Sequence, residues 1–271
     1  DMNIFCGGKG LNQSVALARA GAEVYHAGAI GTDGKMLREQ LAASGAHLDY
    51  LQTLDMPSGH TALQVTPDGQ NCIIVCAGSN AQLTEDYIDS VLAHFGAGDV
   101  ALVQNEVSNV PYIIRQAKAR GLKVAFNASP ITASILSYPL ELVDYYLVNE
   151  TEGRTLSGCD ATDYETILAA LHEKFPAAAI VLTVGSDGVL YQCGDERYSH
   201  GIYRVQAVDT TGAGDTFCGF FLASLAKGLS VPQALENASL ASALAVSRAG
   251  ACDSIPTWAE MEAFAKTAQA K

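Results

Sequence analysis

The stretch Asp209-Thr210-Thr211-Gly212-Ala213-Gly214-Asp215-Thr216-Phe217 decides the fold. Residues 203–208 before it resemble a strand, and residues 215–227 after it carry apolar side chains over a helical length, so we expect a strand-to-helix turn. Gly212 and Gly214 let a ligand approach the backbone closely. The first turn of the helix directs free N–H groups and a positive dipole end to the same point. The stretch therefore predicts an anion site suited to the charge on a transferring phosphoryl group.

Asp215 lies at the mouth of this predicted anion site. A carboxylate there can accept the proton of an attacking hydroxyl group, which is the work of a general base. The alternative is an ordinary glycine turn in which Asp215 only caps the helix. Spacing alone leaves both interpretations open.

Strand-like and helix-like segments alternate along nearly the whole chain. Buried strands are predicted at 24–30, 100–104, 123–127, 145–148 and 180–184. Helices are predicted at 11–20, 34–44, 109–120, 164–175, 215–227 and 232–247. Antiparallel strands are predicted at 188–193 and 198–205, and a hairpin at 61–66 and 72–76 around Pro67-Asp68-Gly69. The pattern predicts an α/β fold with a doubly wound, mostly parallel sheet and helices on both faces. In such folds ligands bind beyond the carboxyl ends of the strands.

A second glycine turn, Gly7-Gly8-Lys9-Gly10-Leu11-Asn12-Gln13, opens the first predicted helix. It is not a Walker-type phosphate loop, because the glycine spacing differs and no Ser or Thr follows the lysine. Lys9 and Asn12 are polar groups near one point and suit the recognition of hydroxyl groups. Since glycine turns are common, a purely structural turn is the alternative.

A third polar segment, Asn149-Glu150-Thr151-Glu152, directly follows the predicted strand at 145–148. Asn149 and Glu152 are three residues apart and fall on one face of a starting helix. They could hold the water shell of Mg²⁺, which keeps most of its waters in proteins. The alternative is a helix start with ordinary acidic residues.

The composition is that of a globular protein with an acidic surface. The chain has 271 residues, of which 49% are hydrophobic and 17% charged, and its net charge is −13. This charge argues against nucleic acids and anionic membranes as partners, and a nucleotide site must rely on backbone N–H groups, helix termini and Mg²⁺. Seven cysteines without a Cys-x-x-Cys pair predict free thiols in a reducing compartment, the cytoplasm.

The first two motifs carry a resemblance to a known family. The pattern Asp-Thr-x-Gly-Ala-Gly-Asp-x-Phe and the pattern Gly-Gly-Lys-Gly-x-Asn, here followed by Gln13, resemble the two signatures of the ribokinase-like family of carbohydrate and nucleoside kinases. The resemblance runs along essentially the whole chain. It implies that Asp215 is the catalytic base, and that the backbone of Gly212, Ala213 and Gly214 forms the anion hole. It also implies that the sugar contacts Gly8, Lys9, Gly10, Asn12, Glu106 and Asp215.

The same resemblance implies the nucleotide and cation sites. ATP would contact Asn149, Thr183, Gly185, Ser186, Gly188 and Gly214, with Ser239 at the position where some members place a histidine beside adenine. Glu152 would govern Mg²⁺ through water. A monovalent cation, K⁺ as an activator, would be caged mostly by backbone carbonyls of Asp209, Thr211, Ala245, Arg248, Gly250 and Ser254.

The resemblance implies an ATP-dependent kinase that phosphorylates the primary hydroxyl of a pentose, and Gln13 after Asn12 favours ribose. Kinases for another sugar or for a nucleoside are the alternatives within the family. A catalytically impaired sugar-binding or regulatory module is the alternative from another class. A NAD-dependent dehydrogenase is disfavoured, because no Gly-x-Gly-x-x-Gly follows an early strand.

We expect a single domain over 1–271, with a small β lid contributed partly by 61–76 and a homodimer formed through the lids. Members of the family begin with a strand that carries an Asn-x-Asp sugar contact. This chain opens directly before Gly7, so roughly 30–40 residues, or two to three strands with their turns, are expected to be missing.

Overall fold

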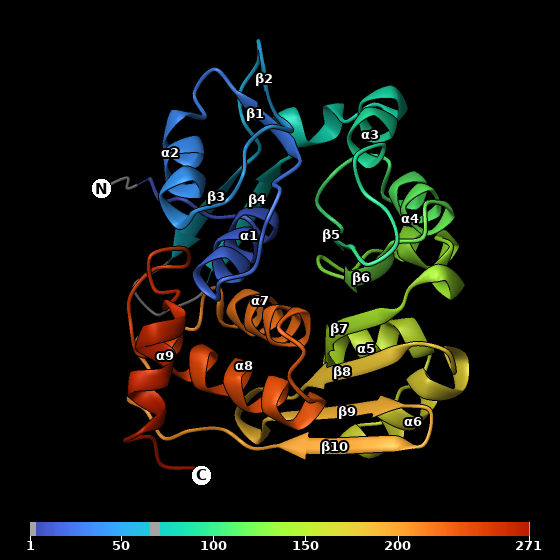
Figure 1. Ribbon diagram of the computed structural model, residues 1–271, viewed down its shortest axis with the longest axis vertical. Helices are drawn as coiled ribbons and strands as arrows, with labels where there is room; N and C mark the ends of the chain where they lie inside the picture. Colours follow the sequence, from blue (N-terminus) through green and yellow to red (C-terminus); the bar gives the residue numbers. More distant parts are fainter. Residues whose placement is uncertain (1–3, 66–70, 271) are drawn as a thin grey trace.

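The computed structural model describes residues 4–65 and 71–270 (Figure 1). Its α-helices are α1 (Lys9–Arg19), α2 (Lys35–Ser44), α3 (Glu85–Leu92), α4 (Val110–Ala119), α5 (Glu150–Ser157), α6 (Tyr164–Lys174), α7 (Ala213–Ala226), α8 (Val231–Val246) and α9 (Trp258–Ala265). Short 3₁₀ helices are η1 (Gly78–Gln82), η2 (Ala133–Ser137), η3 (Leu140–Leu142) and η4 (Gly185–Asp187).

A six-stranded sheet forms the centre of the described chain, in the order β10-β9-β8-β7-β6-β5. Its strands are β5 (Val100–Gln104), β6 (Lys123–Asn127), β7 (Tyr145–Asn149), β8 (Ala179–Thr183), β9 (Val189–Cys193) and β10 (Glu196–His200). The strands from β5 to β8 pair in parallel, whereas β9 pairs antiparallel with both β8 and β10. The predicted mostly parallel sheet is therefore confirmed.

Successive residues of the central strands enter two different hydrophobic cores. On β8, Val181 packs into the core that contains α1, α7 and α8, and its neighbours Ile180 and Leu182 pack into the core that contains α4, α5 and α6. Tyr146 and Leu147 of β7 divide in the same way. Side chains alternate across a strand, so helices on both faces bury both sides of these strands (Figure 1).

Helix α7 is the most deeply buried helix next to the sheet. Its Phe220 and Phe221 are fully buried, and burial of each side chain stabilises the fold by about 1.5–3 kcal/mol. Helix α8 packs against it, and begins at the capping box of Ser230 and Gln233 with Pro232 in its first turn. The helices predicted at 215–227 and 232–247 are thus confirmed within two residues.

Two short sheets lie beside the main one. β1 (Gly28–Gly31) pairs in parallel with β2 (Leu51–Leu54), and β3 (His60–Val65) pairs antiparallel with β4 (Asn71–Cys76). The strand pair at 61–76 was predicted, whereas the turn Pro67-Asp68-Gly69 lies outside the described residues.

Two predicted strands, at 24–30 and 198–205, are confirmed only in part, because β1 begins at Gly28 and β10 ends at His200, and the strand predicted at 203–208 is wrong. Residues 24–27 form only an isolated bridge between Tyr25 and His47, because their backbone bonds to the loop before β2 and not to a full strand. Residues 201–208 continue no sheet after β10. Their backbone instead pairs at Tyr203 with Ala270, and at Val208 with the end of α8. The glycine-rich turn is therefore positioned by α8 and not by a preceding strand.

No helix in the described ranges is long and apolar enough to cross a membrane. The cysteines whose side chains are described are free thiols: Cys6, Cys76, Cys159, Cys193, Cys218 and Cys252.

Candidate active site

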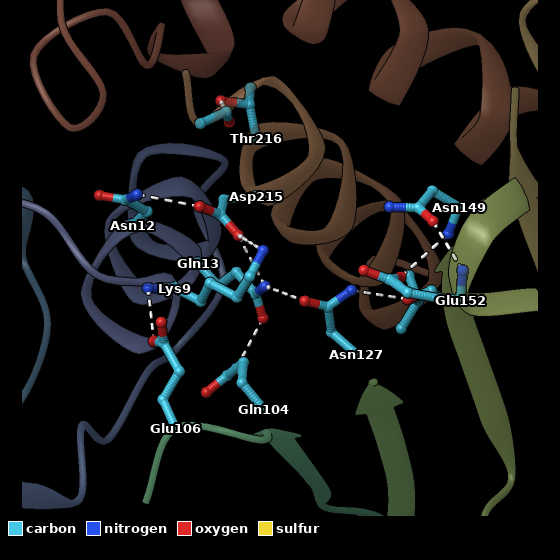
Figure 2. A network of polar contacts seen from close by, with 12 residues as sticks. Lys9, Asn12, Gln13, Gln104, Glu106, Asn127, Asn149, Glu152, Asp215 and Thr216 are labelled. Atoms are coloured by element: carbon cyan, nitrogen blue, oxygen red, sulfur yellow. Dashed lines mark hydrogen bonds and ion pairs between the residues drawn. The ribbon is translucent and has the colours of Figure 1, made fainter. Parts of the chain in front are cut away.

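The site lies along the carboxyl ends of the parallel strands. Gln104, Asn127, Asn149 and Thr183 are the last residues of β5, β6, β7 and β8. The register pairs Gln104 with Asn127 and Asn149 with Thr183. The N-terminal turns of α1 and α7 reach the same edge, as Figure 2 shows for their side chains. This is the edge at which ligands bind in doubly wound folds.

The turn at Gly212 ends in free backbone donors. Gly212 has the left-handed φ of 76° and precedes α7. The amide of Ala213 bonds to Thr210, but within the described residues the amides of Gly214 and Asp215 have no protein acceptor. A Cβ at Gly214 would meet nothing within 4 Å, so open space lies in front of this turn. Two free amides at the positive end of a helix favour an anion there.

A close helix crossing brings α1 to the start of α7. A Cβ on Gly219 would lie 2.4 Å from the Cβ of Ala16, so only glycine permits this approach. Asp215 lies one turn before Gly219, and Asn12 lies one turn before Ala16. Since residues four apart share a helix face, the crossing places Asn12 against Asp215.

The Asp215 carboxylate is held by α1 and not by its own helix. Asn12 Nδ2 donates to Oδ2 at 2.9 Å, and Gln13 Nε2 donates to Oδ1 at 2.8 Å (Figure 2). Lys9 Nζ lies 4.0 Å from Oδ1. Helix α7 has no side-chain cap, so the interpretation of Asp215 as an ordinary helix cap is wrong. Asp215 is 7% exposed, and the side-chain nitrogens of Asn12, Gln13 and Lys9 surround its carboxylate.

Asn12 leaves one buried acceptor without a partner. Its Oδ1 has no hydrogen-bond partner among the described residues, although Asn12 is only 4% exposed. A buried amide oxygen without a donor costs about 1–3 kcal/mol. A ligand hydroxyl group beside Asp215 would satisfy it.

Glu106 fixes the N-terminal turn of α1. Its Oε2 accepts a hydrogen bond of 2.8 Å from the Lys9 amide. Burial raises the pKa of Glu106, whereas the backbone bond to Lys9 and the charge of Lys9 oppose that rise. A Cβ on Gly8 would lie 4.0 Å from the same oxygen, so Gly8 and Lys9 both border this carboxyl group. The structure thus brings Gly8, Lys9, Gly10, Asn12, Glu106 and Asp215 together.

Three amide side chains that had no role in the predicted site adjoin this group. Gln13 bonds to Asp215, to Asn127 and to Gln104 (Figure 2). Gln13 was visible only as the residue after Asn12. Gln104 and Asn127 carry no motif, and the one signal for them was their place at the ends of predicted strands.

Asn149 and Glu152 form a reciprocal cap at the start of α5. Asn149 Oδ1 accepts from the Glu152 amide at 2.9 Å, and Glu152 Oε2 accepts from the Asn149 amide at 3.0 Å. This capping box explains the spacing of the two residues without a metal. Glu152 is 6% exposed. Its Oε2 takes part in the capping box, which leaves Oε1 for another ligand.

The predicted nucleotide contacts lie on two parts of the molecule. Asn149 and Thr183 end adjacent strands, and Gly185, Ser186 and Gly188 follow in and after η4. Ser239 lies inside α8 and is 8% exposed. Helix α8 reaches the anion turn directly, because Ser242 Oγ donates to the Ala213 carbonyl at 3.1 Å.

The predicted cation ligands are only partly joined. Asp209 Oδ1 accepts from the Thr211 amide at 2.9 Å and Oδ2 from the Gly250 amide at 3.1 Å, and these bonds lower the pKa of Asp209. The Ala245 carbonyl accepts from the Arg248 amide. The Arg248 side chain turns to Glu260, and Ser254 Oγ bonds to Ala251. Asp209, Thr211 and Gly250 therefore meet, while no described contact links Arg248 or Ser254 to them.

The described residues contain no group of three or more His, Cys, Asp and Glu side chains that could hold a metal ion. Glu152 alone fits Mg²⁺ that is bound mainly through water and substrate phosphates, because such sites need only one or two carboxylates. For a monovalent cation, the fitting groups are the second lone pairs of Asp209 and of the Ala245 carbonyl.

A buried carboxylate and free helix-terminal amides lie in one helical turn, at the binding edge of a doubly wound sheet. This fold and site define a kinase for a small molecule. The class follows from the geometry, and comparison with known proteins gives the family.

The chain belongs to the pfkB family of carbohydrate kinases, whose family model matches residues 1–258. It is 35% identical to the ribokinase of Haemophilus influenzae over 95% of this chain and 86% of that protein. The structure of Arabidopsis thaliana ribokinase with ribose and ATP matches with a TM-score of 0.87 and 29% identity, over 97% of this chain and 88% of that chain. The ADP complex of Cryptococcus neoformans ribokinase matches with a TM-score of 0.84 and 31% identity, over 96% and 88%.

Proposed function

We propose that this protein transfers the γ-phosphoryl group of ATP to the primary hydroxyl of ribose, giving ribose 5-phosphate and ADP. The observation that carries the proposal is the Asp215 carboxylate. Donors from α1 hold it in the same turn as the free amides of Gly214 and Asp215. The similarity to the Haemophilus influenzae and Arabidopsis thaliana ribokinases supports ribose as the sugar and ATP as the donor.

The sugar end of the site explains proton removal. A substrate hydroxyl donates to Asn12 Oδ1, which satisfies the buried acceptor and anchors the sugar beside Asp215. The primary hydroxyl donates its proton to the Asp215 carboxylate as its oxygen attacks the γ-phosphorus. A new O–P bond forms, the bond to the β-phosphate oxygen breaks, and ADP leaves with that electron pair.

The phosphate end of the site explains charge stabilisation. Negative charge spreads over the γ-phosphoryl oxygens during transfer, and the amides of Gly214 and Asp215 point at it from the positive end of α7. The amides are fixed before the reaction, because Gly212 ends the turn and Ser242 holds the Ala213 carbonyl. Preorganised donors of this kind are worth about 2.7–4 kcal/mol each in other enzymes.

ATP, Mg²⁺ and K⁺ have candidate residues in this chain. The ATP contacts are Asn149, Thr183, Gly185, Ser186, Gly188, Gly214 and Ser239. Glu152 would hold Mg²⁺ through water, and Mg²⁺ neutralises phosphate charge. Asp209, Thr211, Ala245, Arg248, Gly250 and Ser254 would surround K⁺ next to the anion turn, with Asp209 already bonded to Thr211 and Gly250.

The whole chain acts as one kinase domain in this proposal, and β3 with β4 forms part of a lid over the sugar. Ile74 and Val75 of β4 are 52% and 70% exposed, which supports pairing of two lids in a homodimer. Free thiols support a reducing compartment, the cytoplasm. Sedimentation of the wild type beside a variant with Ile74→Lys and Val75→Lys tests the dimer, because only the wild type should sediment as two copies.

Replacement of the base tests the reaction. Asp215→Asn keeps an acceptor oxygen but removes the base, so kcat should fall by roughly 10²–10⁴-fold. Calorimetric affinities for ribose and ATP should change only a few-fold. Asp195→Asn, in the exposed turn between β9 and β10, is the matched control and should keep wild-type turnover. Turnover of Asp215→Asn within a few-fold of the wild type would contradict the assignment.

A further inference from the structure

A chain of side-chain amides runs from the sheet to the Asp215 carboxylate. Asn127 Nδ2 donates to the Leu147 carbonyl of β7 at 2.7 Å. Gln13 Nε2 donates to Asn127 Oδ1 at 3.2 Å and to Asp215 Oδ1 at 2.8 Å. Gln104 Nε2 donates to Gln13 Oε1 at 2.6 Å (Figure 2). Gln13 is fully buried at the junction of this chain.

One backbone group sets the direction of every bond in the chain. A carbonyl can only accept, so Leu147 makes Asn127 present its NH₂ group to the sheet and its Oδ1 to Gln13. Gln13 must then present its NH₂ group, whose two hydrogens serve Asn127 and Asp215. Its Oε1 therefore faces Gln104, which donates to it. A flipped Gln13 amide would place an oxygen against two acceptors.

We infer that Gln13 is a positioning residue for the catalytic base, fixed by Asn127 and Gln104 so that it always presents an N–H group to Asp215 Oδ1. The inference rests on the proposed function for the role of Asp215 as base. With Asn12 on Oδ2, Gln13 confines the carboxylate to one plane and leaves its remaining lone pairs for the sugar hydroxyl. A donated hydrogen bond also stabilises the ionised form, which is the form that accepts a proton.

Charged and titratable groups from neighbouring elements face the same carboxylate. They are Lys9 at the start of α1, Glu106 after β5, and the Cys218 thiol on α7, whose pKa is raised by burial first and then by Asp215. Gln13 itself is neutral. A change from Gln13 to another neutral residue leaves these three groups in place, so its effect on titration reports the lost hydrogen bond.

The test is Gln13→Met, which keeps length and volume but removes both donors. We expect kcat to fall roughly 10–100-fold, as for other misplaced catalytic groups, while KM for ribose changes much less. The acid limb of the kcat profile should move to higher pH. In ligand-free protein, the ¹³C carboxyl signal of Asp215, assigned by its loss in Asp215→Asn, should titrate at higher pH than in the wild type.

Two further variants complete the design. Gln104→Met removes only the bond to Gln13 Oε1, so it should move the Asp215 titration in the same direction by less, and it decides the question if Gln13→Met does not fold. Ser224→Ala removes a partly buried hydrogen bond that Asn237 donates to Ser224 Oγ further along α7, and it should lower only the melting temperature.

The inference is overturned if the Asp215 carboxyl titrates alike in the wild type and in the folded variants, with only stability lowered. The carboxyl titration needs no substrate. Absence of kinase activity in the wild type would therefore contradict the proposed function and leave this readout to decide the role of Gln13.

Discussion

At the scale of single residues, the site joins side chains that lie about 200 positions apart in the sequence. Helices α1 and α7 cross closely at Ala16 and Gly219. Asp215 contacts Asn12 and Gln13 because these residues lie about one turn before the crossing on their helices. Each contact to the carboxylate comes from an N–H group, which a buried carboxylate needs in place of water. The remaining acceptor, Asn12 Oδ1, has no donor among the described residues, so a substrate hydroxyl that donates to it would form a new buried hydrogen bond.

Glu152 offers a residue-scale prediction about Mg²⁺. Glu152→Gln keeps an oxygen for the Asn149 amide, and glutamine is also found in capping boxes, so the melting temperature should barely change. Loss of the charge should raise the Mg²⁺ concentration for half-maximal rate by about 10-fold or more. Glu150→Gln in the same helical turn is the control. Equal Mg²⁺ dependence in both variants would exclude a metal role for Glu152.

The sequence could indicate Asp215, Asn12 and Lys9, because each belongs to a glycine-rich motif that opens a helix. It could not indicate the partners of Gln13. Gln104 and Asn127 become neighbours only through strand register, which depends on long-range pairing. The sequence also could not distinguish a capping box from a metal site at Asn149 and Glu152, since both need the same spacing.

At the scale of elements, the start of α7 is the reactive feature. In the proposed reaction its two free amides and its dipole stabilise the phosphate, while Asp215 in the same turn accepts the proton of the hydroxyl. The close crossing at Gly219 packs α1 against α7, so Asn12 and Gln13 are held beside the turn that carries the free amides.

Two glycines of this turn should respond oppositely to alanine. Gly214 has a helical backbone and open space at its Cβ position, so Gly214→Ala should raise the free energy of unfolding by up to about 1 kcal/mol through helix propensity. The added methyl group occupies the phosphate space, so kcat/KM for ATP should fall. Gly212→Ala adopts a left-handed φ and should cost about 1–2 kcal/mol.

Urea unfolding and ATP kinetics on both variants check this prediction. Its distinctive outcome is a Gly214→Ala protein that is at least as stable as the wild type and a poorer enzyme. Unchanged ATP kinetics in that variant would place the phosphate elsewhere.

The sequence predicted elements well where apolar periodicity is long, as in α7, α8 and β5 to β8. It failed at residues 203–208, whose apolar side chains resemble a strand but whose backbone bonds to Ala270 and to the end of α8. Those partners are far away in the sequence, so the local pattern of side chains could not predict them. It omitted α3, α9 and β2, which are short, with eight, eight and four residues.

At the scale of the whole molecule, two hydrophobic cores enclose the sheet and leave its carboxyl edge for chemistry. The net charge of −13 would oppose ATP, and in the proposed function backbone dipoles, Lys9 and bound cations offset that charge at the site. The doubly wound class was predictable from alternation alone, because buried parallel strands require helices on both faces.

The most direct test of the proposed reaction is phosphorus NMR of the product formed from ATP and ribose, with 5-deoxyribose as the matched substrate that lacks the primary hydroxyl. We predict one ADP per ribose 5-phosphate, with the new phosphorus signal coupled to the two protons on C5, and no sugar phosphate from 5-deoxyribose. Phosphate on another ribose oxygen, or equal phosphorylation of 5-deoxyribose, would contradict a kinase that uses Asp215 to activate the primary hydroxyl.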